Sequence, residues 1–121
     1  MIVLGFRGTC ALMLMGALGC LCRYGLSLTM PSTQGSWPWA TLLVNVVGSL
    51  LIALLYALCT EHGQLSPEMT LVIQVGFLGG LTTFSSFSLE TLRLLETRGP
   101  MLALSYMLAS LFMGLGAAWV G

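Results

Sequence analysis

Apolar residues fill four long stretches of the chain, and short polar segments separate them. The stretches run roughly over residues 5–29, 40–59, 69–95 and 101–120. Each offers about the 20 residues that a helix needs to cross about 30 Å of hydrocarbon. None shows the alternation of apolar and polar positions that a membrane β-barrel requires. The pattern therefore predicts an all-α integral membrane protein with four transmembrane helices in one domain, residues 1–121.

The segments between the stretches are rich in turn-forming residues, namely PSTQGSWPW at 31–39, EHGQLSPE at 61–68 and ETRGP at 96–100. Trp37 and Trp39 stand where an aromatic belt residue meets the membrane boundary. A cleaved signal would be followed by a polar mature domain, whereas here the apolar character continues. We therefore expect Met1 to Leu28 to form a retained first transmembrane helix.

Composition supports a membrane protein. The chain is 57% hydrophobic and 7% charged, whereas a soluble domain is about 25% charged. Its four basic and four acidic residues cancel, so no charged face predicts a nucleic-acid partner. The four cysteines lack the spacing of a metal site, and only one histidine accompanies them. We therefore expect the cysteines to act as small buried hydrophobic side chains.

The few basic residues also bear on membrane topology. Four spans place Arg7 on one side of the membrane and Arg98, with Arg93 and Arg23 less clearly, on the other. Because lysine and arginine in short loops set orientation, so small a difference predicts insertion both ways round. Two copies could then pair with the inverted symmetry that larger transporters obtain by duplication. The alternative is one fixed topology with a slight preference.

Small residues recur at helical spacing in three of the spans. In lipid such stripes let helix backbones approach closely. They favour a homo-oligomer, most simply a dimer. The stripes are Tyr106, Ser110, Gly114 and Ala118; Gly76 and Gly80; and Asn45 and Ser49.

Three polar side chains inside the spans require an explanation, because such groups are costly in a membrane. Asn45 is either glue between helices or an amide donor for an anion that has lost its water. Arg23, which costs about 2.5–3.5 kcal/mol at a helix centre, either reaches the interface or attracts anions to a pore mouth. Glu90 either pairs with Arg93 at i+3 or serves as a buried carboxylate.

The third stretch contains GFLGGLTTFSSFS at residues 76–88. Gly79 and Gly80 weaken a helix by about 1 kcal/mol each relative to alanine, and Thr82 and Thr83 compete for its backbone bonds. We therefore expect a break near the middle of the membrane, which frees backbone carbonyls. Such oxygens suit a small cation.

Beyond the break, helical spacing places Phe84, Phe87, Ser88 and Thr91 within about 100° of one another. The edge of an aromatic ring is its positive rim. Two rings seen edge-on can therefore receive an anion without burying a cation. Weak binding at several sites lets the ion leave again.

These motifs resemble those of the Fluc/CrcB family of fluoride channels. The likeness covers GFLGGLTTFSSFS, an arginine late in the first span (GCLCRYG), an asparagine early in the second (TLLVNVVGS) and a small-rich fourth span (SYMLASLFMGLG). It implies an antiparallel, dual-topology homodimer in the cell inner membrane. Two pores would let fluoride leave passively, protecting the cell from its toxicity, and a structural sodium ion would lie at the dimer interface.

The resemblance also implies roles for single residues. One departure is Gly114, where some members carry a serine, which leaves one end of the hydroxyl track in doubt. The implied roles are Phe84 and Phe87 as an aromatic box; Asn45 as a pore-lining amide; Thr83, Ser86, Tyr106 and Ser110 as a hydroxyl track; Gly79 and Thr82 as carbonyl ligands of sodium; Arg23 in the vestibule; and Glu90 beyond the box.

Two other functions stay open at this point, and neither is catalytic. A small dual-topology, proton-coupled multidrug exporter would need a lone carboxylate deep in a span, and the first span contains none. A membrane scaffold would transport nothing and leaves the hydroxyl and aromatic pattern unexplained.

Overall fold

The computed structural model describes residues 1–33 and 35–121, and within these ranges all regular structure is helical. The first two spans are α1 (Phe6–Thr29) and α2 (Trp39–Thr60), and the last is α6 (Pro100–Val120). The third span is Pro67–Arg98. Each of these four spans is long enough and apolar enough to cross a membrane. The prediction of four spans is confirmed, with boundaries that differ by at most three residues. Gln34, in the predicted connector 31–39, lies outside the described residues.

The third span consists of four consecutive elements. They are α3 (Pro67–Leu71), the π-helix η1 (Val72–Leu78), α4 (Gly79–Leu81) and α5 (Phe84–Arg98). Ser66 begins the span by accepting a hydrogen bond from the Met69 N–H at 3.2 Å, which is the usual role of an N-cap serine. The π-helix was not predicted, and such turns often mark functional sites.

A tight turn joins the third span to the fourth. Gly99 adopts φ +89°, a conformation that glycine reaches without the strain a side chain would cause. Pro100 follows at the first position of α6, where its missing N–H costs nothing. The predicted turn is therefore present but is confined to Gly99, because residues 96–98 of the predicted connector belong to α5 and Pro100 begins α6.

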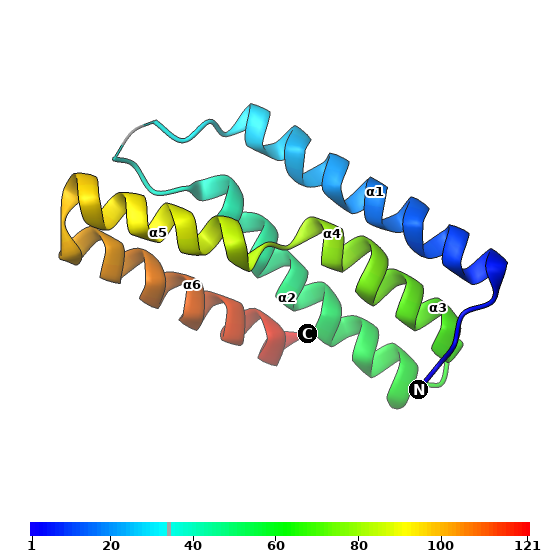
Figure 1. The fold of residues 1–121 in the computed structure, drawn as a ribbon. Coiled ribbons are helices and arrows are strands. Elements are labelled where there is room, and N and C mark those ends of the chain that lie inside the picture. Colours follow the sequence, from blue (N-terminus) through cyan, green and yellow to red (C-terminus); the bar gives the residue numbers. More distant parts are fainter. Residues whose placement is uncertain (34) are drawn as a thin grey trace.

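The break makes the third span change partners along its length. Figure 1 shows α1 and α6 on opposite sides of the molecule, with α2 and the third span between them. The first half of the third span, η1 and α4, packs along α1, whereas α5 packs along α6. α2 packs along α6 and contacts every part of the third span. The break therefore lies at the centre of the bundle.

Two separate buried clusters mirror this change of partners. One joins α2, α5 and α6 around Tyr106, whose side chain is fully buried. The other joins α2 to η1 and α4 around Leu78 and Leu81. The break lies between these clusters, so packing fixes both of its ends.

The glycine stripe of the third span packs against α1 of the same chain. A Cβ on Gly80 would meet the carbonyl of Gly16 and lie 3.1 Å from the backbone nitrogen of Cys20. A Cβ on Gly76 would lie 2.9 Å from the carbonyl oxygen of Leu12. The Gly76 and Gly80 step therefore serves packing within one chain, which corrects its use as support for an oligomer.

The stripe on α6 is used within the chain as well. A Cβ on Gly114 would lie 3.6 Å from the Ser49 hydroxyl of α2, and Tyr106 is buried against the same bundle. Gly76, Gly80, Gly114 and Tyr106 of these stripes therefore pack within the chain and give no support for self-association.

Candidate functional site at the helix break

The break falls on two threonines. Thr82 (φ −83°, ψ 155°) and Thr83 (φ −153°, ψ 116°) are both extended, as β-branched residues favour. Gly79 and Gly80, which we expected to help break the helix, remain helical in α4. Their small size serves packing instead, because Gly80 lies against α1. The predicted break is therefore confirmed, although the threonines rather than the glycines carry it.

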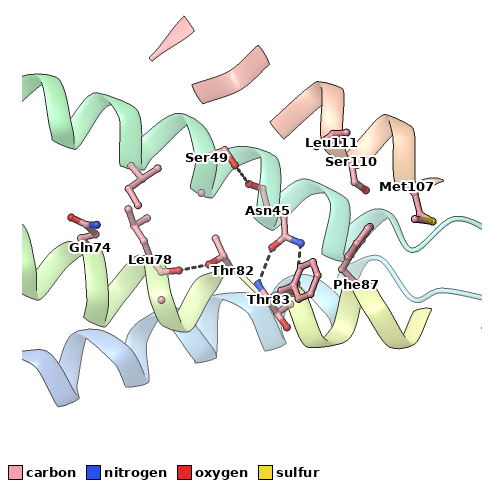
Figure 2. A pocket seen from close by; sticks show the side chains of 14 residues that line it. Asn45, Ser49, Gln74, Leu78, Thr82, Thr83, Phe87, Met107, Ser110 and Leu111 are labelled. Atoms are coloured by element: carbon pink, nitrogen blue, oxygen red, sulfur yellow. Dashed lines mark hydrogen bonds between the residues drawn. The ribbon is translucent and has the colours of Figure 1, made fainter. Parts of the chain in front are cut away.

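Asn45 of α2 holds the break by bonding both backbone groups of one residue. Its Oδ1 accepts from the Thr83 N–H at 2.8 Å, and its Nδ2 donates to the Thr83 carbonyl at 3.0 Å. Figure 2 shows the amide reaching from α2 to the break. The side chain thus satisfies a donor and an acceptor that the interrupted helix leaves without partners.

Hydroxyl groups complete the two ends of the break. The Thr82 hydroxyl donates to the Leu78 carbonyl at 2.8 Å, which closes the end of α4. The Thr83 hydroxyl accepts from the Ser86 N–H at 3.1 Å, which is an N-cap for α5. The predicted competition between threonine side chains and the helix ladder is therefore observed.

These side-chain bonds divert backbone donors away from two carbonyls. In a continuous helix the N–H of Thr83 would bond the Gly79 carbonyl, and the N–H of Ser86 would bond the Thr82 carbonyl. Here the Thr83 N–H bonds Asn45 and the Ser86 N–H bonds the Thr83 hydroxyl. The carbonyls of Gly79 and Thr82, the predicted cation ligands, thus lose their i+4 donors.

A cavity of about 540 Å³ lies beside the break, and we call it the central cavity. Figure 2 shows side chains from α2, the third span and α6 around it. The described lining residues contain no charged side chain. The predicted site residues that line it are Asn45, Gly79, Thr82, Thr83, Phe84, Phe87 and Ser110.

The aromatic and hydroxyl groups of this cavity are well defined. The rings of Phe84 and Phe87 lie 5.7 Å apart between centroids, and Phe84 is 78% exposed. Ser110 contributes a buried hydroxyl that has no hydrogen-bond partner within the described part of the chain. The cavity is therefore lined by two aromatic rings and one buried hydroxyl, and its described lining carries no formal charge.

A second cavity of about 360 Å³, the arginine cavity, lies on the other side of Thr83. Predicted site residues Arg23, Ser86 and Glu90 line it, and Thr83 lines both cavities. The Arg23 Nε donates to the Gly80 carbonyl at 3.1 Å. The arginine therefore contacts the break itself, which neither the interface nor the pore-mouth interpretation predicts.

Glu90 is held by two hydroxyl donors. Its Oε1 accepts from Thr41 at 2.9 Å and its Oε2 accepts from Tyr106 at 3.3 Å. Both oxygens thus bond hydroxyls rather than Arg93, the pairing considered from sequence. Tyr106 lines neither cavity, and its ring packs 5.4 Å from that of Phe87. The carboxylate is therefore hydrogen-bonded to Thr41 and to Tyr106, and the Tyr106 ring packs against that of Phe87.

Two expectations about polar side chains need correction. Ser88 and Thr91 donate to the Phe84 and Phe87 carbonyls of their own helix at 2.9 and 2.7 Å, so they do not add hydroxyls to the cavity. Asn45 uses one of its two N–H donors on the break, so at most one remains for an ion.

The sequence interpretation missed several polar residues at the site. Gln74 and Ser49 line the central cavity, and Thr41 and Ser27 line the arginine cavity. Gln74 is a lone amide in an apolar run, and Ser49 stands one turn after Asn45. Those positions were visible in the sequence, but only the fold shows that they face the same spaces.

Known proteins are similar in sequence to this chain along nearly its whole length. Residues 10–121 match the family described as CrcB-like protein, Camphor Resistance (CrcB). A relative from Citrifermentans bemidjiense, named fluoride-specific ion channel FluC, is 45% identical over 89% of this chain and 88% of its own. One of the same name from Thermus thermophilus is 50% identical over 88% of this chain and 85% of its own. The chain therefore belongs to the CrcB family.

Proposed function

We propose that this protein is a fluoride-specific ion channel that lets fluoride leave the cell passively. The observation that carries the proposal is the match to relatives of that name, at 45% and 50% identity over most of both chains. The geometry supports it, because a break in the third span places polar groups beside a cavity at the centre of the bundle. A multi-pass membrane location agrees with the four spans.

The central cavity supports an anion route. Phe84 and Phe87 line it with aromatic rings, and the buried Ser110 hydroxyl has no hydrogen-bond partner among the described residues. These groups attract an anion weakly, and weak binding at successive points allows release. Thr83 lines both cavities and Ser86 and Glu90 line the second, so we assign these residues to the continuation of the route.

We assign a structural sodium ion to the carbonyls of Gly79 and Thr82. The donor set fits, because a hard cation prefers oxygen ligands and both carbonyls have lost their i+4 donors. Their residues also line the central cavity. When bound, the ion would supply positive charge that holds such carbonyls together.

Two antiparallel copies of the chain would complete the channel in the inner membrane. Phe84 is 78% exposed in one chain, although it lines the central cavity. The weak bias of the basic residues supports insertion in both orientations. Pairing of two chains would cover the ring and bring two sets of break carbonyls into one complex.

Fluoride efflux from proteoliposomes tests the function directly. Purified chain should release fluoride, measured with a fluoride electrode, while chloride is retained. Phe84→Ile and Phe87→Ile should each abolish efflux and leave the dimer intact on size exclusion. The matched control is Phe112→Ile, because Phe112 is 68% exposed on α6 and lines neither cavity.

The same liposomes separate this function from its rivals. Efflux that is unchanged in both cavity variants would contradict the aromatic assignment. Drug-driven proton movement that Glu90→Gln removes would establish a proton-coupled exporter instead. If the correctly assembled wild-type protein shows no ion flux, the membrane scaffold is the function that remains.

A further inference from the structure

Among the described residues, Arg23 makes one hydrogen bond, to a backbone carbonyl just before the break. The Nε of this partly buried residue donates to the Gly80 carbonyl at 3.1 Å, across 57 residues of sequence. A guanidinium that only sought the membrane interface would point away from the bundle. One that only attracted anions would need no backbone partner.

The contact matters because of where Gly80 lies. In a continuous helix the N–H of Phe84 would bond its carbonyl, but the extended Thr82 and Thr83 intervene. Arg23 bonds this carbonyl in its place. The Gly80 oxygen is thus occupied by Arg23, while the carbonyls of Gly79 and Thr82 have lost their i+4 donors.

Close packing fixes the distance between the arginine and the break. A Cβ on Gly80 would overlap α1 at Gly16 and Cys20. A Cβ on Gly19, one turn before Arg23, would meet the Phe77 carbonyl and lie 2.8 Å from the Leu81 nitrogen. The first and third spans therefore touch through backbone on both sides of the contact, so the guanidinium has little freedom to shift.

We propose that Arg23 is a positioning residue for the cation site. By bonding the Gly80 carbonyl, it keeps that oxygen out of the cation site and holds the backbone that spaces the carbonyls of Gly79 and Thr82. This inference rests on the proposed function, which assigns sodium to those two carbonyls. It gives Arg23 a role that neither anion attraction nor interface anchoring requires.

The test measures how monovalent cations stabilise the detergent-solubilised dimer. Thermal unfolding is followed in lithium, sodium and potassium chloride, with N-methylglucamine chloride as the inert reference. Arg23→Met removes every donor and frees the Gly80 carbonyl. We expect the sodium concentration for half-maximal stabilisation to rise at least tenfold and the preference for sodium over potassium to be lost. The control is Arg7→Met, an exposed arginine on the same helix.

Two further variants separate the effect of the arginine charge from the effect of its hydrogen-bond geometry. Arg23→Lys keeps the charge but not the planar Nε–H, so it should restore less than half of the sodium preference. Arg23→Gln keeps an N–H donor without charge and should retain more of that preference than Arg23→Met. If Arg23→Met does not assemble, the comparison of the lysine and glutamine variants decides the same point.

The outcomes distinguish this inference from the function beneath it. A sodium-dependent wild type with unchanged dependence in Arg23→Met overturns the inference alone, as does full restoration by lysine. A wild type indifferent to all the cations overturns both the inference and the sodium assignment. Fluoride efflux from wild-type liposomes reports separately on the channel itself.

Discussion

Asn45 spends both ends of its side-chain amide on the backbone of Thr83. Each such hydrogen bond contributes about 0.5–1.5 kcal/mol net, but a buried group left unpaired costs about 1–3 kcal/mol. Because Thr83 is buried, losing the amide would strand two backbone groups. At the scale of single residues, the site therefore depends on side chains that replace missing backbone partners.

Asn45→Leu should lower stability more than a conservative change, because both Thr83 groups lose their partner. We expect a loss of about 2–4 kcal/mol from two stranded groups, measured by thermal or chaotrope unfolding in detergent. Asn45→Gln keeps both the donor and the acceptor of the amide on a longer side chain, so its loss should be smaller. Equal stability of Asn45→Leu and wild type would refute the proposed hold on the break.

Thr83→Val tests the cap of α5. Removing the hydroxyl leaves the Ser86 N–H without its acceptor, which should cost about 1 kcal/mol, and it also removes a polar group from both cavities. We expect slower fluoride efflux with modest destabilisation, and recovery of both in Thr83→Ser. The control is Thr97→Val, because the Thr97 hydroxyl bonds its own helix at 2.7 Å on an exposed surface.

At the scale of elements, the third span is two half-helices that pack against different neighbours. η1 and α4 lie along α1, and α5 lies along α6, as Figure 1 shows. The first contact relies on glycine, since a Cβ at Gly19 or Gly80 would overlap the facing backbone. Without a hydrophobic effect between helices in lipid, such close packing is a main source of association.

Gly19→Ala should therefore disrupt the contact between α1 and the third span. The added methyl would meet the Phe77 carbonyl, so the helices must separate, and we expect lower thermal stability and weaker efflux. Gly25→Ala lies on the same helix with nothing within 4 Å of the added carbon. It should behave like wild type, and an equal loss in both variants would contradict the packing argument.

At the scale of the whole molecule, one chain leaves much apolar surface and one cavity-lining ring uncovered. Phe84 is 78% exposed although it belongs to the central cavity. Lipid can cover apolar side chains, but the carbonyls of a break require protein or water around them. The proposed pairing of two chains would meet that requirement.

Dual insertion is measurable with two reporters at the C-terminus, one active outside the membrane and one active inside. We expect both to be active in the wild type, because basic residues are nearly balanced between the two sides. Glu96→Lys with Thr97→Lys should shift the chain toward the orientation that keeps this turn in the cytoplasm. A reporter active on one side only in the wild type would exclude dual topology.

Much of this architecture was predictable from local sequence. Span length and hydropathy gave four helices, and Gly99 with Pro100 marked a turn. The break was predictable from the density of hydroxyls and glycines, but its position was not. Glycine propensity favoured residues 79–80, whereas packing against α1 keeps these residues helical and the break moves to the threonines.

The site was predictable only in part. The resemblance named site residues on several spans, and seven of those positions share one cavity. The partners of Arg23 and Asn45 were not foreseeable, because each bonds a residue distant in sequence. The π-helix also escaped prediction, since no local propensity distinguishes Val72–Leu78 from an ordinary helix.

The bond from Asn45 to Thr83 means that the location of the kink depends on a neighbouring helix as well as on the threonines of the helix that bends. α2 and the third span run antiparallel, so moving the asparagine one turn, by exchanging it with Ser49, would carry its grip about 5.4 Å back toward Gly79. An amide that faces two adjacent threonines on a neighbouring helix is thus a local arrangement that could be placed at other positions. It offers designers of helical bundles a way to interrupt one helix by combining two threonines on it with an amide on the adjacent helix.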